Sequence, residues 1–246
     1  MSQFIIPSSE LQKEQFCLRG AEAHHLIHVL RVQPNDAIDL FDGRGRQARG
    51  VVLSVEKTNN VVTGRISETG SASIRPAQVH LFQGLPRGSK FDYVIEKATE
   101  LGVDAIIPFL SQKNSVRLSP EQAQAKLPRW ENVIRASAKQ CERATLPLIE
   151  TPRSFDDLEG RLKAGLSLVG SQEATGPSLK DSLKQKPPQL KLVNIVIGPE
   201  SGFSKNEMTR MREWGVQAVS LGGRVLRSET AGPAFLSILN YEWELD

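Results

Sequence analysis

Apolar runs of strand length alternate with amphipathic helical patterns from residue 78 to the C-terminus, and this alternation most constrains the fold. The run Val79–Leu85 precedes a helical pattern over 89–102, and Val103–Phe109 is the next run. Gly102 stands where a helix commonly ends in a glycine. This order predicts an α/β fold, in which helices cover a mostly parallel sheet. Ligands of such sheets bind at the loops that follow the carboxyl ends of the strands, so function is expected there.

The same alternation continues along the rest of the chain. Further strands are expected at 146–150, 166–170, 190–198 and 216–222. Further helices are expected at 130–143, 155–162, 204–215 and over the C-terminus. Residues 176–189 predict a loop with at most a short helix.

The N-terminal part has a different pattern. Short runs rich in β-branched residues lie at 37–43, 48–57 and 59–67, and one helical pattern covers 21–32. Such spacing predicts a small β-rich module, a barrel. The polar stretch 67–78, with its Gly, Ser and Pro, is typical of a connection between domains. We therefore expect two domains, residues 1–72 and 73–246.

The composition is that of a soluble globular protein, with 39% hydrophobic and 24% charged residues. No run approaches the roughly 20 apolar residues of a membrane span, and the N-terminus does not resemble a signal peptide. A cytoplasmic protein is expected. Cys17 and Cys141 form neither a disulfide framework nor a metal pair. His24 and His28 are one helical turn apart, but no third ligand has a suitable spacing, so no metal is expected.

Positive charge is concentrated in one segment. Residues 111–153 carry eight Lys or Arg and four Glu, an excess of four, whereas the whole chain carries +3. A local basic excess of this kind suits a surface that binds a polyanion. A solvated helix surface is the alternative, because Glu131 and Arg135 are spaced as a helical ion pair.

The loop "IGPESGFS", residues 197–204, follows an apolar run and precedes a helical pattern. It lacks the Gly-Lys-Ser/Thr of a P-loop, the Gly-x-Ser-x-Gly of a nucleophile elbow and the spacing of GxGxxG. Ser204 and Glu207 form a capping box, which predicts that a helix begins there. The glycines permit close approach of a ligand, although a plain strand-to-helix connection has the same features.

A second polar loop, "SLGGRVLRSETAGPAF", spans residues 220–235. Thr230 is the expected N-cap of its helix, which would put Pro233 in the first turn. Arg227 and Glu229 make the loop more polar than packing requires, although a surface ion pair would also explain them. A third loop at 168–176 also follows an expected strand. Together, the three loops could form one pocket at one edge of the sheet.

The segments "IGPESGFS" and "LGGRVLRSETA", found together, resemble the signature of the SPOUT superfamily of methyltransferases. Within it, the chain is similar to the RsmE family, the 16S ribosomal RNA uridine-N3 methyltransferases. The resemblance extends over essentially the whole chain. The segment "HHLIHVLRVQPNDAIDLFDGRG" is similar to the PUA-like domain of that family, and "KATELGVDAIIP", "ASAKQCERATLP" and "SQEA" occur at corresponding places.

The resemblance implies a trefoil-knotted parallel-sheet domain of the SPOUT type, preceded by a small PUA-like β-barrel domain. It implies S-adenosylmethionine (SAM) as cofactor, 16S rRNA or the small ribosomal subunit as partner, and a homodimer in which each subunit completes the other's active site. Candidate cofactor-binding residues are Gly170, Gly198, Pro199, Glu200, Gly202, Leu221, Gly223 and Leu226. Candidate RNA-binding residues are Arg19, Arg31, Arg44, Arg135, Lys139 and Arg143.

Methylation at N3 of uridine requires loss of the N3 proton. The site therefore needs a proton acceptor, or a cation that stabilises the deprotonated base. Arg227 is the candidate cation for a uracil oxygen or a phosphate, and Glu229 and Glu200 are candidate bases or orienting residues.

Two positions depart from the family pattern. Ser201 stands where a glycine is usual, and a left-handed backbone there would cost about 1 kcal/mol. Ser228 stands in place of the usual threonine.

Two other classes of function fit the sequence less well. A non-catalytic RNA-binding protein of this fold would be indicated by loss of the Glu and Arg of the two loops, and both are present. A Ser–His hydrolase is disfavoured because no histidine follows His80.

Overall fold

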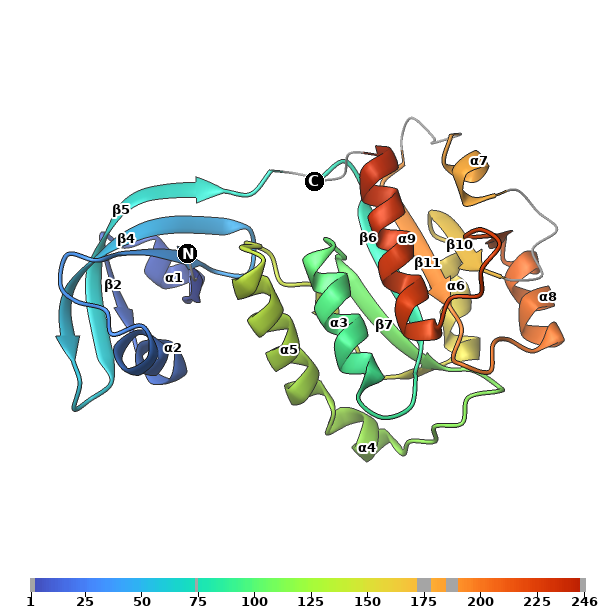
Figure 1. Cartoon of the computed structure of the whole chain (residues 1–246), viewed down its shortest axis with the longest axis horizontal. Coiled ribbons are helices and arrows are strands. Elements are labelled where there is room, and N and C mark those ends of the chain that lie inside the picture. Colours follow the sequence, from blue (N-terminus) through green and yellow to red (C-terminus); the bar gives the residue numbers. More distant parts are fainter. Residues whose placement is uncertain (1–2, 74, 172–177, 185–189, 244–246) are drawn as a thin grey trace. The chain divides into compact units, whose positions relative to one another are not determined.

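The computed structural model of the chain describes residues 3–73, 75–171, 178–184 and 190–243. Its contacts divide the chain into two compact units (Figure 1). The N-terminal unit comprises residues up to 74 together with Arg135–Leu146, and the C-terminal unit comprises Arg75–Ile134 and the chain from Pro147 onward. Each unit is described separately below.

The N-terminal unit is built on a five-stranded sheet with the order β1-β3-β4-β5-β2. β1 pairs with β3 in parallel, and the other pairs are antiparallel. The strands are β1 (Gln3–Ile5), β2 (Gln15–Leu18), β3 (Ala37–Phe41), β4 (Arg46–Glu56) and β5 (Val61–Ser71). Its helices include α1 (Ser8–Leu11), α2 (Gly20–His24) and the π-helical turn η1 (His25–Val29). The helical pattern at 21–32 is thus confirmed.

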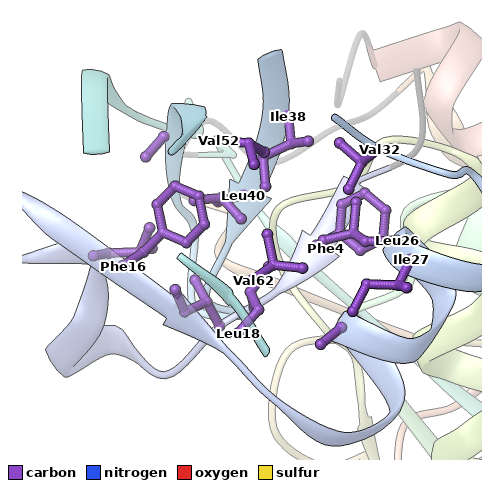
Figure 2. Packing of buried hydrophobic residues seen from close by; sticks show 14 residues of the cluster. Phe4, Phe16, Leu18, Leu26, Ile27, Val32, Ile38, Leu40, Val52 and Val62 are labelled. Carbon is purple, nitrogen blue, oxygen red and sulfur yellow. The ribbon is translucent and has the colours of Figure 1, made fainter. Parts of the chain in front are cut away.

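Apolar side chains from strands and helices form the core of this unit (Figure 2). Phe16 on β2 is 2% exposed and lies against β4 and β5 where Gly50 and Gly64 have no side chain. A Cβ at Gly64 would stand 2.3 Å from the Phe16 ring, so glycine at this position makes room for it. Alternation along the strands supplies the rest of the core, as the β-rich pattern predicted.

The expected connection at 67–78 is shorter than predicted. β5 continues to Ser71, and residues 68–71 pair with Arg46–Arg49 of β4. Strand pairing uses backbone groups, and these residues are exposed, so their polar side chains do not oppose it. The interpretation of 67–71 as part of a linker was wrong.

Residues 135–146 complete the N-terminal unit although they are distant in sequence. The Gly45 amide donates to the Ala144 carbonyl at 3.1 Å, and the Leu146 amide donates to the Gly43 carbonyl at 2.9 Å. The Lys139 ammonium lies 2.9 Å from a Glu22 carboxylate oxygen and 5.1 Å from the centre of the Phe4 ring. This segment includes the last turns of α5 (Leu127–Gln140).

The C-terminal unit contains a seven-stranded sheet, and every pairing recorded in it is parallel. The order is β12-β10-β11-β6-β7-β8, and β9 also pairs with β7. The strands are β6 (Gln78–Gly84), β7 (Ala105–Leu110), β8 (Leu148–Ile149), β9 (Arg153–Ser154), β10 (Leu166–Gly170), β11 (Leu192–Ile197) and β12 (Gln217–Val219). The parallel α/β prediction is confirmed.

Helices follow these strands as the alternation predicted. They are α3 (Lys90–Glu100), α4 (Pro120–Gln124), the 3₁₀ turn η2 (Phe155–Leu158), α6 (Glu159–Leu162), α7 (Leu179–Leu183), α8 (Lys205–Glu213) and α9 (Ser228–Trp243). α3 and α9 pack side by side, as Figure 1 shows. Gly102, just past α3, has φ +78°, as its position after a helix required.

The carboxyl ends of four adjacent strands lie at one edge of this sheet. Val219 of β12 pairs with Gly170 of β10, Val196 of β11 pairs with Val169, and Ile197 pairs with Gln83 of β6. The loops after β10, β11 and β12 therefore meet at this edge.

Candidate functional site

Described residues of all three loops line a cavity of about 920 Å³. All the candidate catalytic and cofactor-binding residues line it: Gly170, Gly198, Pro199, Glu200, Gly202, Leu221, Gly223, Leu226, Arg227 and Glu229. Lys90, from the first turn of α3, and Lys113, from the loop after β7, also line it. Of the third loop, residues 172–177 lie outside the described residues. The described loops thus form one pocket, as the sequence predicted.

The loop after β11 is held close to β6 by a glycine. A Cβ at Gly84 would stand 2.4 Å from the Pro199 nitrogen, too close for any side chain. Pro199 and Gly202 then close a turn, in which the Gly202 amide donates to the Pro199 carbonyl at 2.9 Å. The helix after the loop begins as predicted, because Ser204 and Glu207 form the capping box of α8.

Ser201 does not have the strained, left-handed backbone that its place in the family pattern led us to expect. The left-handed residue of the turn is Gly202, with φ +67°, and Ser201 is not among the positive-φ residues of the described chain. Serine is therefore tolerated at position 201 without the cost anticipated from the sequence. Its hydroxyl donates to the Lys113 carbonyl at 2.6 Å.

A buried hydroxyl joins two of the loops. Ser228 Oγ donates to the Gly198 carbonyl at 2.6 Å and accepts a hydrogen bond from Gln83 Nε2 at 2.8 Å. Gln83 is fully buried, and Ser228 is 7% exposed. The link fixes the loop after β12 to the loop after β11. Gln83 was not singled out in the sequence, because an isolated glutamine in a strand gives no local signal.

The last helix begins earlier than predicted. α9 starts at Ser228, and the amides of Thr230 and Ala231 both donate to the Arg227 carbonyl at 2.9 Å. Thr230 is therefore not the N-cap, and Pro233 lies inside the helix. Proline there removes the N–H that would bond to the carbonyl four residues earlier. The prediction failed because buried Ser228 is fixed by Gln83 and Gly198, which are remote in sequence.

Lys90, at the start of α3, stands between the two carboxylates of the site. Its ammonium lies 3.2 Å from Glu200 Oε1 and 3.4 Å from Glu229 Oε1. The hydrogen bond to Glu200 raises the pKa of Lys90, and the bond to Glu229 adds to the effect. Sequence reasoning missed Lys90, since its partners are more than 100 residues away. A lysine in the first helical turn after a strand-end loop is the only local signal.

Glu200 is held in its ionised form. Burial alone would raise its pKa, but the amide groups of Glu200 and Arg87 and the ammonium of Lys90 keep the pKa below the usual value. Glu229 is different, because its Oε2 is buried and has no hydrogen-bond partner in the described chain. The two carboxylates thus have distinct environments.

Three cations of the cavity wall lack a partner that would balance their charge. Within the described chain, the side chains of Lys113, Arg224 and Arg227 have neither an ion pair nor a hydrogen-bond partner. With Lys90, they outnumber Glu200 and Glu229 among the lining residues by four to two. The cavity is therefore suited to a ligand that brings negative charge.

The candidate RNA-binding residues all belong to the N-terminal unit, although they come from two segments of the chain. Arg19, Arg31, Arg44 and Arg135 are exposed. Lys139 is paired with Glu22, and its side chain is 17% exposed. Arg143 donates from Nε to the Thr145 hydroxyl at 3.0 Å. Lys139 therefore contributes to packing within the unit.

No group of three His, Cys, Asp or Glu side chains among the described residues is placed to hold a metal ion. His28 instead contacts Asn60 at 3.0 Å. Cys17 and Cys141 are not joined in a disulfide. Within the described chain, no helix is both long and apolar enough to cross a membrane.

Comparison with known proteins gives consistent matches. Residues 73–240 match the model of an RNA methyltransferase domain, and residues 18–62 match that of an RNA methyltransferase PUA domain. "Ribosomal RNA small subunit methyltransferase E" of Bacillus subtilis (strain 168) is 31% identical over 252 residues, covering 100% of this chain and 98% of that protein.

Solved structures agree with these matches. The structure of a ribosomal RNA small subunit methyltransferase E from Neisseria gonorrhoeae, bound to S-adenosyl methionine, has a TM-score of 0.87 at 27% identity, covering 99% of this chain and 98% of that chain. The structure of a Legionella pneumophila putative methyltransferase with bound SAM has a TM-score of 0.85 at 28% identity, covering 97% and 96%. The predicted fold class, a SPOUT-type parallel-sheet domain preceded by a PUA-like domain, is thereby confirmed.

Proposed function

The chain belongs to the RNA methyltransferase family of the ribosomal RNA small subunit methyltransferase E type, and from this premise we propose that it transfers a methyl group from SAM to N3 of a uridine in small-subunit ribosomal RNA. The family supports a SAM-dependent methyltransferase of small-subunit rRNA. The choice of uridine N3 is what the resemblance to the RsmE family implies, and the positive charge of the cavity supports it.

The cavity fits SAM by size and by lining. Its volume is within the range of small-molecule sites. Apolar side chains, among them Ile197, Leu221 and Leu226, are suited to an adenine ring. A Cβ at Gly222 or Gly223 would meet no atom within 4 Å, so these glycines leave open space beside the backbone. Backbone groups of Gly198, Leu221, Gly223 and Leu226 would hold the cofactor, which supplies an electrophilic methyl group when bound.

The positive charge at the cavity suits a substrate nucleophile that becomes negatively charged when it loses its proton. Arg227 lines the cavity with an uncompensated guanidinium, which would stabilise negative charge on the oxygens of a deprotonated uracil. Arginine is well suited to this because its planar donors can bond to an oxygen in a fixed geometry. Uncompensated Arg227 at a SAM-sized cavity is the observation that carries the assignment.

The two carboxylates would have different roles. Glu200 is an unsuitable base because its lowered pKa makes it a weak proton acceptor, so we assign it to orienting Lys90. Glu229 retains one oxygen without a hydrogen-bond donor, and it is the better candidate for accepting the N3 proton. Ser228 and Gln83 hold the two loops at a fixed separation.

The N-terminal unit would supply further contacts with RNA. Arg19, Arg31, Arg44 and Arg135 are exposed on this unit and suit phosphate binding. We assign RNA binding to the domain of residues 1–72 together with the segment 135–146 that joins its unit, and catalysis to the rest of residues 73–246. We place the enzyme where small subunits assemble, in the cytoplasm.

We also propose a homodimer formed through α9. This helix carries few charges, and its exposed residues Thr230, Ile238 and Tyr241 recur at helical spacing with half-buried Ala234. Ile238 is 37% exposed and Tyr241 87% exposed. An exposed helix face with so little charge is typical of a subunit interface.

The test of the reaction uses small subunits and naked 16S rRNA isolated from a strain that lacks the enzyme. Incubation with radiolabelled SAM, followed by mass mapping, should locate one methyl group on N3 of a uridine. A methyl group on another atom or base would refute the assignment.

Arg227→Ala tests the catalytic role. It should reduce methyl transfer by at least about 100-fold, as expected for loss of a transition-state contact, while the Kd for SAM by calorimetry changes little. Arg212→Ala, at an exposed residue of α8 outside the cavity lining, is the matched control and should retain activity. Full activity of Arg227→Ala would exclude the assigned role.

A further inference from the structure

The loop after β7 is attached to the site by consecutive residues. The Gln112 amide donates to Glu207 Oε1 at 2.7 Å, the Lys113 carbonyl accepts from Ser201, and Asn114 Nδ2 donates to the Leu85 carbonyl at 2.9 Å. The next residue, Ser115, accepts from Arg87 Nε. Four residues in a row thus contact three segments of the same unit: α8, the loop after β11 and the loop after β6.

This attachment fixes the backbone of Lys113 while leaving its ammonium available. Glu207, the partner of Gln112, is 3% exposed and fixed by the capping box of α8, and Asn114 is also 3% exposed. Lys113 is an exposed residue of the cavity lining, and its ammonium has no partner in the described chain. A lysine whose backbone is held at a cavity wall while its charge is unpaired is arranged to bind a ligand anion.

The choice of anion follows from the two ligands of the proposed reaction. SAM carries one carboxylate, and uracil is neutral before it loses its proton. The remaining negative charge on the substrate is the phosphodiester backbone, which supplies most of the affinity of proteins for RNA. Lys113 and Arg224 together offer two uncompensated cations at the cavity besides Arg227.

We propose that Lys113 binds a backbone phosphate beside the target nucleotide, and that Ser201 holds the Lys113 loop against the cofactor loop. Ser201 is thereby a positioning residue, which joins the loop that contacts SAM to the loop that contacts RNA. This inference rests on the proposed function and names the phosphate subsite of that site.

The first experiment measures binding of a short uridine-containing single-stranded RNA by fluorescence anisotropy over a range of salt concentrations. S-adenosylhomocysteine is present so that no turnover occurs. Lys113→Gln should weaken binding by about tenfold, and it should make the slope of log K against log salt less steep by about 0.7, the value for one phosphate contact. Lys113→Arg should retain the slope.

Lys191→Gln is the matched control. Lys191 is exposed and immediately precedes β11, at the end of the strand away from the cavity, so affinity and slope should stay unchanged. An unchanged slope for Lys113→Gln would overturn the proposal. A weaker Kd for SAM with unchanged RNA affinity would also overturn it, because Lys113 would then bind the cofactor carboxylate.

The role of Ser201 is tested through KM. Ser201→Ala removes only the hydroxyl and should raise the KM for RNA severalfold, with little change in the KM for SAM, and Ser201→Thr should restore the wild-type value. Equal effects on both KM values, or no effect, would contradict the positioning role.

The binding experiment on Lys113 measures RNA affinity without methyl transfer. A Lys113-dependent slope in an enzyme that leaves uridine N3 unmodified would therefore refute the proposed function but support the phosphate subsite.

Discussion

Lys90 contacts two carboxylates, Glu200 and Glu229, that are more than 100 residues away from it in sequence. The two carboxylates differ in their hydrogen bonds. Glu200 receives two backbone N–H groups and the ammonium, and its pKa is lowered. Its charge interactions therefore contribute to stability above its usual pKa of 4.5 and are lost only as the pH falls through the lowered value. Around neutral pH, Glu200 stays ionised.

The expected consequence is a pH–rate profile that does not depend on Glu200 titration. Glu200→Gln should lower kcat by about tenfold at every pH between about 6 and 9, because Lys90 loses a partner without loss of a base. The midpoint of the acidic limb should not move. Glu229→Gln is the comparison, and it should lower kcat by more than Glu200→Gln does, because it removes the proposed proton acceptor. If Glu200→Gln has the larger effect and changes the shape of the profile, Glu200 is the base.

The elements around the cavity are positioned by close backbone contacts that sequence patterns do not reveal. Strands β3 to β8 and β10 to β12, the capping box at Ser204 and the glycine after α3 were predictable, since each depends on neighbours within a few residues. The start of α9 and the contacts of Lys90 were not, because partners on other elements decide them. The short strands β1, β2 and β9 were not predicted either. The loop residues expected from the sequence do line the cavity, but Lys90, Lys113 and the hydrogen bonds that hold the loops were not foreseen.

Gly84 provides a test of how the loop after β11 is held against β6. Gly84→Ala should push the Pro199 turn away from β6 and weaken SAM binding by more than about tenfold, because the added methyl group would meet backbone that cannot move independently. Calorimetry would measure the Kd. Gly160→Ala on α6 is the control: no atom lies within 4 Å of its added Cβ, so it should leave SAM binding unchanged and increase stability slightly. Equal SAM affinity in both variants would contradict the role of Gly84.

The whole molecule is proposed to act as a dimer, and the face of α9 gives this proposal a direct test. Ile238→Arg should shift the mass measured by light scattering from twice 27.1 kDa towards 27.1 kDa, because an unpaired charge is costly in an apolar interface. Leu53→Arg is the control, since Leu53 is an apolar residue of the N-terminal unit that is 47% exposed. A wild-type protein that already measures 27.1 kDa would refute the dimer.

The return of residues 135–146 to the N-terminal unit has a consequence for synthesis. The polypeptide enters the C-terminal unit after residue 74, leaves it for Arg135–Leu146 and then re-enters it. During translation, the first unit cannot be completed until Leu146 has left the ribosome, although its last strand ends at Ser71. Its Lys139–Glu22 contact must also wait. Folding of the two units is therefore interleaved in time, unlike the sequential order usual for domains of a nascent chain.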